Sequence, residues 1–267
     1  MEFPVYIVLG PWRIHPHVLF ESLSYFIGFR VYLWTRRPSE MSRLMSLQIL
    51  AGTILGAALG AKLLFWLEDP AAAWEQLRQL HFLWGGKTIV GGLLGGLIGV
   101  ELTKKWVGWT RSTGDDFAYP LILGLCIGRI GCFLTGLDDH TYGMPTTWFT
   151  GIDFGDGIRR HPTQLYEIFF LLVLALLLIP LYRRSRAPVG GRPGSIYLPG
   201  RMFQWFMFGY LAFRFAVDFI KPTPHPYFGL NNIQLACLAG LVYYAWLLWV
   251  RGRVRRSSAA AEARSYK

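Results

Sequence analysis

Two arginines within apolar stretches are the residues whose type and position most directly suggest chemistry. Arg129 lies inside the apolar run 121–135, and Arg214 lies in a second run, with Tyr210 four residues before it and Asp218 four residues after it. Residues four apart share one face of a helix, so Tyr210 and Asp218 are expected beside Arg214. Ionisable residues inside a membrane are costly and are functional candidates by default. Because a guanidinium forks onto phosphate oxygens, the two arginines predict a site for an anionic phospholipid headgroup.

Further polar residues are expected at a similar depth. Glu21 lies near the start of the first apolar run, and Glu167 lies one turn into the fifth. Segment 161–167 enters the fifth run, and its Pro-Thr pair is typical of a helix start. His161, Gln164 and Glu167 recur at three-residue spacing and are expected near one face of that helix. The structural alternatives are that His161 anchors a loop and that Arg214 is neutralised by its own neighbour on the helix.

The elements that must position these residues are apolar runs in a chain of 267 residues, 53% of them hydrophobic. A helix needs about 20 apolar residues to cross a bilayer. The runs are 18–34, 44–66, 88–103, 117–136, 163–181, 202–220 and 233–250. We therefore predict an all-α polytopic membrane protein with about seven transmembrane helices.

The net charge is +11, and the basic residues are distributed unevenly among the loops between these runs. Most lysines and arginines fall in alternate loops, and the positive-inside rule places such loops in the cytoplasm. The N-terminus is then outside and the C-terminus cytoplasmic, and no nucleic acid is expected as a partner. We predict one transmembrane domain over 1–250 with an outer loop region around 137–162. A basic, disordered tail is predicted over 251–267.

Three cysteines, Cys126, Cys132 and Cys237, lie within apolar runs. An odd number with none in an outer loop gives no disulfide framework. No residue spacing resembles a zinc or haem site, so neither a metal nor a cofactor is expected. An intramembrane cysteine is usually a small hydrophobe, and a nucleophilic role for Cys132 is the alternative.

Glycines spaced four apart predict that neighbouring helices approach each other closely. The spaced sets are Gly52, Gly56 and Gly60 in the second run, Gly91, Gly92, Gly95, Gly96 and Gly99 in the third, and Gly124 and Gly128 in the fourth.

Seven short motifs occur in order along nearly the whole chain. They are 25–29, 60–62, 91–92, 128–131, 142–146, 161–167 and 210–218. Together they resemble the bacterial prolipoprotein diacylglyceryl transferase family, and His161-Pro-Thr-Gln-Leu-Tyr-Glu167 is the most specific match. The family's topology, with seven helices and the N-terminus outside, agrees with the prediction made from charge.

The resemblance implies transfer of a diacylglyceryl group from phosphatidylglycerol to the lipobox cysteine of a prolipoprotein, with release of glycerol phosphate. It also implies a multi-pass protein of the bacterial inner membrane whose active region faces the outer side, with the signal peptide of the prolipoprotein as a partner. Arg129 and Arg214 match the family's arginines at the phospholipid headgroup, and Asp218 matches its glutamate.

The chain departs from the family pattern at several polar positions. Cys132, Thr135 and Leu137 replace two asparagines and a glutamate, Val90 replaces a histidine, and Glu21 replaces a tyrosine. The family's expected catalytic base is therefore missing, and Glu21 or His161 would have to replace it. The residues predicted for catalysis are Arg214, Asp218, His161 and Glu21, and those predicted to bind substrate are Arg129, Tyr210, Gln164, Glu167 and Cys132.

Three functions remain open from the sequence. The first is the family's own reaction with a replaced base. The second is transfer from the same lipid donor to a different acceptor, because the altered positions suggest a rebuilt acceptor side. The third is a non-catalytic protein that binds lipid on the same scaffold, which the missing histidine favours.

Overall fold

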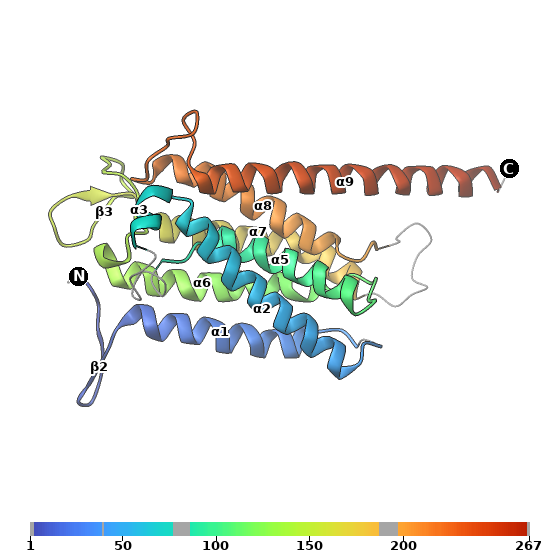
Figure 1. Cartoon of the computed structure of the whole chain (residues 1–267), viewed down its shortest axis with the longest axis horizontal. Coiled ribbons are helices and arrows are strands. Elements are labelled where there is room, and N and C mark those ends of the chain that lie inside the picture. The colour runs from blue at the N-terminus through green and yellow to red at the C-terminus, as the bar shows by residue number, and fades with distance from the viewer. Residues whose placement is uncertain (1–2, 39, 77–85, 187–196, 266–267) are drawn as a thin grey trace. The chain divides into compact units, whose positions relative to one another are not determined.

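The structure, a computed structural model, describes residues 3–38, 40–76, 86–186 and 197–265, and it is mainly helical (Figure 1). The α-helices are α1 (Pro16–Thr35), α2 (Arg43–Trp66), α3 (Pro70–Gln76), α5 (Ile89–Trp106), α6 (Ala118–Thr135), α7 (Thr163–Ser185), α8 (Arg201–Val217) and α9 (Asn232–Ser265). Three 3-10 helices, η1 (Gly114–Phe117), η2 (Gly136–Asp139) and η3 (Asp218–Ile220), flank α6 and α8. Two antiparallel pairs complete the list, β1 (Ile7–Leu9) with β2 (Trp12–Ile14) and β3 (Ile152–Asp153) with β4 (Arg159–Arg160).

Each predicted apolar run corresponds to one long helix, and the ends differ by a few residues except in α9. Among the described residues, four helical segments are long and apolar enough to cross a membrane: Arg43–Trp66, Gly114–Asp139, Thr163–Ser185 and Asn232–Val250. Helix α8 is only 17 residues long, and the last two turns of α5 carry Glu101, Lys104 and Lys105. The chain is therefore a helical membrane protein, and the count of seven crossings stays a prediction.

The described residues group into two compact units, which we describe separately. The first unit comprises Met1–Arg37, Ser112–Pro222 and Tyr244–Lys267, and the second comprises Pro38–Arg111 and Thr223–Tyr243. This division into two compact units does not test the single transmembrane domain predicted over 1–250, which stays a prediction.

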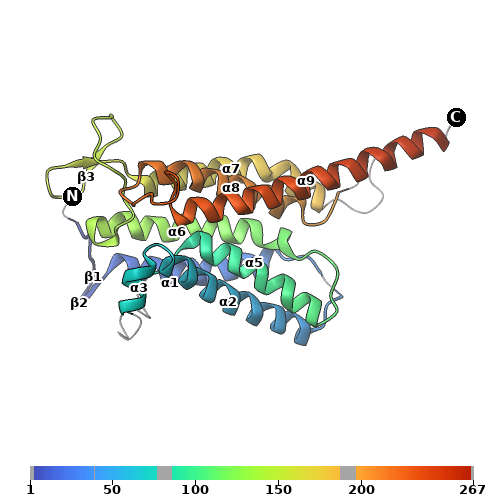
Figure 2. The same ribbon diagram turned by 45° about the horizontal axis from the view of Figure 1, so that its top comes forward.

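In the first unit α6 packs between α1 and α7, and α8 packs against α7 (Figures 1 and 2). Helix α1 approaches α6 closely at Gly131, where an added Cβ would lie 2.6 Å from the Cβ of Phe20. The N-terminus of α8 is held by Asp115, whose carboxylate accepts the backbone N–H groups of Gly200 and Phe203. These contacts join α1, α6, α7 and α8 into one packed group of helices.

In the second unit α2 and α5 meet along the predicted glycines (Figure 2). A Cβ added to Gly56 would lie 2.4 Å from the carbonyl oxygen of Gly95, and one added to Gly60 would lie 2.3 Å from that of Gly91. The close approach of a neighbouring helix, predicted for each of these two glycine sets, is therefore confirmed, and the structure shows that the two sets face each other. The prediction for Gly128 is wrong, because an added Cβ there would meet no atom within 4 Å in the described part of the chain.

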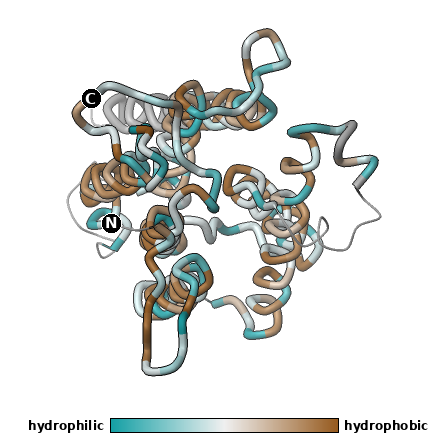
Figure 3. Tube along the Cα trace, turned by 90° about the vertical axis from the view of Figure 1, so that its left-hand side faces the viewer, coloured by the Kyte–Doolittle hydropathy of each residue, from teal (hydrophilic) through white to brown (hydrophobic). Residues whose placement is uncertain are grey.

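Two features differ from the sequence-based expectation. Helix α9 continues through the basic stretch to Ser265, where a disordered tail was predicted. Alanine and arginine are among the strongest helix formers, so a helix can extend through this stretch without an apolar face. Short strand pairs also occur, and β3–β4 lies in the predicted loop region 137–162. Coloured by hydropathy, the helices are largely brown and the teal residues gather in the connections and at the helix ends (Figure 3).

Candidate functional site

The two intramembrane arginines converge on one carboxylate. Arg129 comes from α6, Glu167 from the first turns of α7, and Arg214 from the last turn of α8. Arg129 Nη2 lies 3.0 Å from Glu167 Oε2, and Arg214 Nη1 lies 3.3 Å from the same oxygen. Arg214 Nη2 also lies 2.9 Å from Asp218 Oδ1, across one helical turn. We call Arg129, Glu167, Tyr210, Arg214 and Asp218 the arginine cluster.

Tyr210 is part of this cluster, but its partner differs from the one expected. The sequence predicted that Tyr210 would hold Arg214, whereas its hydroxyl donates to Glu167 Oε1 at 2.7 Å. Glu167 therefore accepts from one phenol and pairs with two guanidinium groups, which satisfies both carboxylate oxygens. The spacing on α8 correctly placed Tyr210 on the same face as Arg214, but the position of α7 decided which group it contacts.

The cluster is buried: Arg129 is 5% exposed and Arg214 is 4% exposed. Buried charges are retained only when they are paired, and the two guanidinium groups are balanced here by the two carboxylates. Pairing with Glu167 also explains how two arginines can lie close together despite their mutual repulsion. The arrangement holds two guanidinium groups in fixed positions between α6, α7 and α8.

Each of the two guanidinium groups has one nitrogen atom without a partner in the described part of the chain. Within the described residues, Nε of Arg129 and Nε of Arg214 are buried and have no hydrogen-bond partner. A buried donor without a partner costs about 1–3 kcal/mol, and such atoms often mark a place where a ligand or water binds. Two unsatisfied N–H groups on converging arginines suit the oxygens of a phosphate diester.

Lys221 lies at the edge of the cluster and was not predicted as a site residue. Its Nζ lies 3.9 Å from Asp218 Oδ1, and its side chain is 11% exposed. Burial, reinforced by the charges of Arg214 and Arg129, lowers the pKa of Lys221 from 10.5 to about 7. Its position three residues after Asp218 is the signal that could have found it, since that spacing keeps it beside the same carboxylate.

The contacts of Gln164 and His161 lie at the loop that precedes α7. Gln164 Nε2 donates to Thr141 Oγ1 at 3.0 Å, and Gln164 Oε1 has no partner within the described residues. His161 Nδ1 lies 3.0 Å from the Tyr166 hydroxyl, and the His161 backbone N–H donates to the carbonyl of Met144. These contacts attach the loop to the start of α7, so they favour the loop-anchoring alternative for His161.

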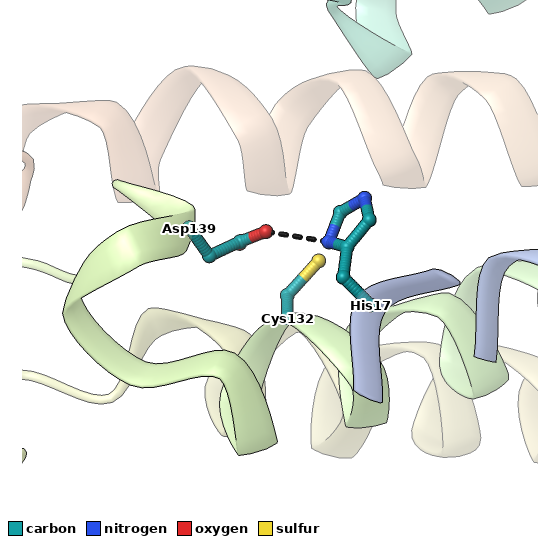
Figure 4. Close-up of side chains that lie close together, drawn as sticks. All are labelled: His17, Cys132 and Asp139. Atoms are coloured by element: carbon teal, nitrogen blue, oxygen red, sulfur yellow. Dashed lines mark ion pairs between the residues drawn. The ribbon is translucent and has the colours of Figure 1, made fainter. Parts of the chain in front are cut away.

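Cys132 and Glu21 belong to a second group of polar residues. His17 Nδ1 lies 2.7 Å from Asp139 Oδ1, and the Cys132 thiol lies beside them (Figure 4). Glu21 Oε2 lies 3.6 Å from His17 Nε2. We call His17, Cys132 and Asp139 the histidine–cysteine cluster. Sequence reasoning missed His17 and Asp139 as site residues because they are far apart in the chain and lie on different helices, α1 and η2.

The two clusters adjoin at α6. Arg129 Nη1 donates to Cys132 Sγ at 3.8 Å, one helical turn further along the same helix. Of the nine predicted site residues, Arg129, Glu167, Tyr210, Arg214 and Asp218 form one cluster. Cys132 and Glu21 lie at the second cluster, and His161 and Gln164 hold the loop.

Comparison with known proteins identifies the family of the chain. A family model described as "Prolipoprotein diacylglyceryl transferase" matches residues 4–250. A phosphatidylglycerol–prolipoprotein diacylglyceryl transferase of Bordetella parapertussis is 32% identical over 262 residues, which cover 91% of this chain and 89% of the relative. Proteins of the same name from Methylobacillus flagellatus and Nitratidesulfovibrio vulgaris are each 31% identical, over 92% of this chain and 95% and 93% of their own lengths. The chain therefore belongs to the prolipoprotein diacylglyceryl transferase family.

Proposed function

We propose that this chain transfers the diacylglyceryl group of phosphatidylglycerol to the lipobox cysteine of a prolipoprotein. The observation that carries the proposal is the convergence of Arg129 and Arg214 on Glu167, in a chain that belongs to this family. In the reaction, the sulfur of the acceptor cysteine forms a bond to the glyceryl carbon. The bond between that carbon and the phosphate oxygen breaks, and glycerol phosphate leaves with the electron pair.

The arginine cluster suits the leaving group of this reaction. Negative charge grows on the departing phosphate, and fixed donors in a water-poor site stabilise such charge strongly. The unused Nε–H groups of Arg129 and Arg214 would donate to the phosphate oxygens. Glu167 and Asp218 keep the guanidinium groups in place, so little reorganisation is needed when the lipid binds. His161 and Gln164 support the loop beside the site.

The protein would act as a multi-pass protein of the bacterial inner membrane. We propose seven crossings, with the N-terminus outside and the C-terminus in the cytoplasm, because most basic residues fall in alternate loops. This orientation puts the start of α7 and the histidine–cysteine cluster on the outer side, where a prolipoprotein signal peptide would present its cysteine.

A second candidate is transfer from the same lipid to a different acceptor. Cys132, with His17 and Asp139 beside it, stands where the resemblance to the family predicts asparagine. If the acceptor binds beside this changed position and the phosphate binds at the arginines, the change would alter the acceptor and not the donor. A panel of acceptors with cysteine, serine or lysine at the reacting position distinguishes the two candidates.

The test is transfer by purified protein in vesicles that contain phosphatidylglycerol, with a lipobox peptide as acceptor. Wild type is expected to produce diacylglyceryl-cysteine, and Arg129→Ala and Arg214→Ala are expected to reduce the rate about 10²- to 10³-fold. Arg111→Ala is the matched control, because Arg111 pairs with Glu40 at an exposed position.

Rescue of cells depleted of their own transferase provides the cellular version of this test. Binding of phosphatidylglycerol without transfer to any acceptor would support a non-catalytic lipid-binding protein and would overturn the proposal. Full transfer by the Arg129→Ala/Arg214→Ala double variant would show that the arginine cluster is not the lipid site.

A further inference from the structure

Three side chains of different chemical types point toward one another at the outer end of α6. His17 comes from the first turn of α1, Cys132 from the last turn of α6, and Asp139 from the end of η2 (Figure 4). One ligand atom from each lies within 4.8 Å of those of the other two. His17 Nδ1 and Asp139 Oδ1 lie 2.7 Å apart and Cys132 Sγ lies beside them, so a metal ion bound by all three would replace the direct contact between His17 and Asp139.

The backbone around this cluster explains how the three residues meet. The absence of a side chain at Gly131 lets the start of α1 come close to α6, where an added Cβ would lie 3.3 Å from the carbonyl oxygen of Pro16. This contact puts His17 next to Cys132. Helix η2 then turns the chain so that Asp139 returns toward α6, and the Thr141 hydroxyl donates to the second oxygen of Asp139. Asp139 is thus fixed from two sides.

The donor set matches the preferences of zinc. Zn²⁺ takes cysteine sulfur, histidine nitrogen and carboxylate oxygen in tetrahedral sites, and catalytic sites keep three protein ligands with a fourth position open. Zinc-bound histidines usually direct their other ring nitrogen at a carboxylate, which fixes the tautomer. Here Nδ1 of His17 faces the cluster, and Glu21 lies 3.6 Å from Nε2 on the opposite edge of the ring.

We propose that His17, Cys132 and Asp139 bind a zinc ion whose fourth position takes the thiol of the acceptor cysteine. This inference rests on the proposed function, because it assigns the acceptor side of the same reaction. A thiol that coordinates a divalent metal is deprotonated, so the site would supply the thiolate without a protein base. That role fits a chain with Val90 where the resemblance predicts a histidine.

The step balances in atoms and electrons. The acceptor thiol releases its proton to water as the sulfur coordinates zinc, whose oxidation state does not change. The sulfur then forms the bond to the glyceryl carbon, the carbon–oxygen bond to phosphate breaks, and glycerol phosphate leaves. The thioether product is neutral and a weak metal ligand, so it can be replaced by the next thiol.

The position of Arg129 supports a metal site for the acceptor thiol next to an arginine site for the phosphate. Its Nη1 lies 3.8 Å from Cys132 Sγ, so the metal position and the proposed phosphate position are neighbours. Transfer between a nucleophile and a leaving group requires this adjacency. The charges are also compatible, because the Cys132 thiolate and the Asp139 carboxylate neutralise the two charges of zinc beside the guanidinium.

Metal binding is tested on the purified full-length protein with zinc alone as the probe. Wild type should contain one zinc per chain, and Cys132→Ser and His17→Ala should raise the Kd at least about 100-fold, since even substitutions behind the ligands cost 10- to 100-fold. Cys237→Ser, at a second buried cysteine, is the matched control and should bind normally. Cobalt substitution should give a sulfur-to-metal charge-transfer band that is absent from Cys132→Asn. Thermal unfolding of this variant shows whether it is folded.

The absence of zinc from wild type, or binding that Cys132→Ser leaves unchanged, would overturn the inference. The acceptor role has its own test, in which a lipobox peptide with cysteine should shift the cobalt spectrum and the serine peptide should not. Chelation should reduce transfer at least tenfold, and added zinc should restore it. Transfer that continues unchanged in chelator would overturn the inference while the proposed function stands. A cobalt shift with the cysteine peptide but no transfer would reject the proposed function and support the metal site.

Discussion

In the second unit α2 and α5 meet along glycines, whereas in the first unit α6, α7 and α8 meet around charged side chains. Gly56 and Gly95 bring two backbones into contact without any functional group between them. Arg129, Glu167 and Arg214 instead fill the space between helices with three ions. Both regions are contacts between helices, yet only the one in the first unit carries side chains that can bind or react.

In an apolar chain, contacts that only pack helices together can be told from functional sites by the free energy of burying the groups involved. Glycine contacts gain dispersion energy and need no compensation, so they are explained by stability alone. Buried ions cost several kcal/mol each to desolvate, and apolar residues of similar size often stabilise a protein as well or better. The arginine cluster is therefore better explained by a function than by stability.

Among single substitutions, Arg214→Ala is expected to have the largest effect on transfer and stability. Transfer should fall about 10²- to 10³-fold. The unfolding free energy should fall about 3–5 kcal/mol, because Glu167 and Asp218 each lose a cationic partner. Transfer rates and thermal unfolding in detergent measure the two effects. Full activity in this variant would mean that the cluster is structural like the glycine contacts.

The counterpart in the glycine region is Gly56→Val. The added Cβ would lie 2.4 Å from the carbonyl oxygen of Gly95, so the two backbones must separate, and we expect a loss of about 3 kcal/mol. The transfer rate of the folded fraction should not change. Gly92→Ala is the control, because its nearest neighbours lie 3.8 Å away. A catalytic defect at normal stability would contradict a purely structural role.

Lys221, at the edge of the arginine cluster, is expected to make stability depend on pH, which the uncharged glycine contacts do not. In the folded protein the pKa of Lys221 is about 7, whereas the unfolded side chain keeps its proton up to about pH 10.5. Between these values the unfolded chain binds more protons, so stability should rise with pH. From pH 7 to 8.5 the gain is at most about 2 kcal/mol.

Lys221→Met should remove this rise, and thermal unfolding across the pH range measures it. Lys105→Met, at an exposed position of α5, is the matched control. An unchanged pH profile in Lys221→Met would show that another group titrates in this window.

The smallest expected effect is that of Gly128→Ala. The added methyl has room, and alanine favours a helix by about 1 kcal/mol over glycine, so stability should rise slightly. Transfer should stay at the wild-type rate. Thermal unfolding provides the measurement, and a clear loss would reveal a contact that makes Gly128 resemble Gly56.

The long helices and the polar face of α8 could be predicted from the sequence alone. Hydrophobic run length and four-residue spacing are local properties, and they located α7 from Thr163 and placed Tyr210, Arg214 and Asp218 together. The motifs also identified the family, because their order is a property of the chain alone.

Only the tertiary structure decided which groups meet across helices. That Glu167 lies between Arg129 and Arg214, and that His17 and Asp139 meet beside Cys132, depends on how α1, α6, α7 and α8 pack. Gly56 and Gly128 differ for the same reason. Glycine spacing in one helix does not show whether the backbone of another helix lies beside it. The physical reason is that a contact between helices depends on their rotation and separation, which the periodicity of one helix does not contain.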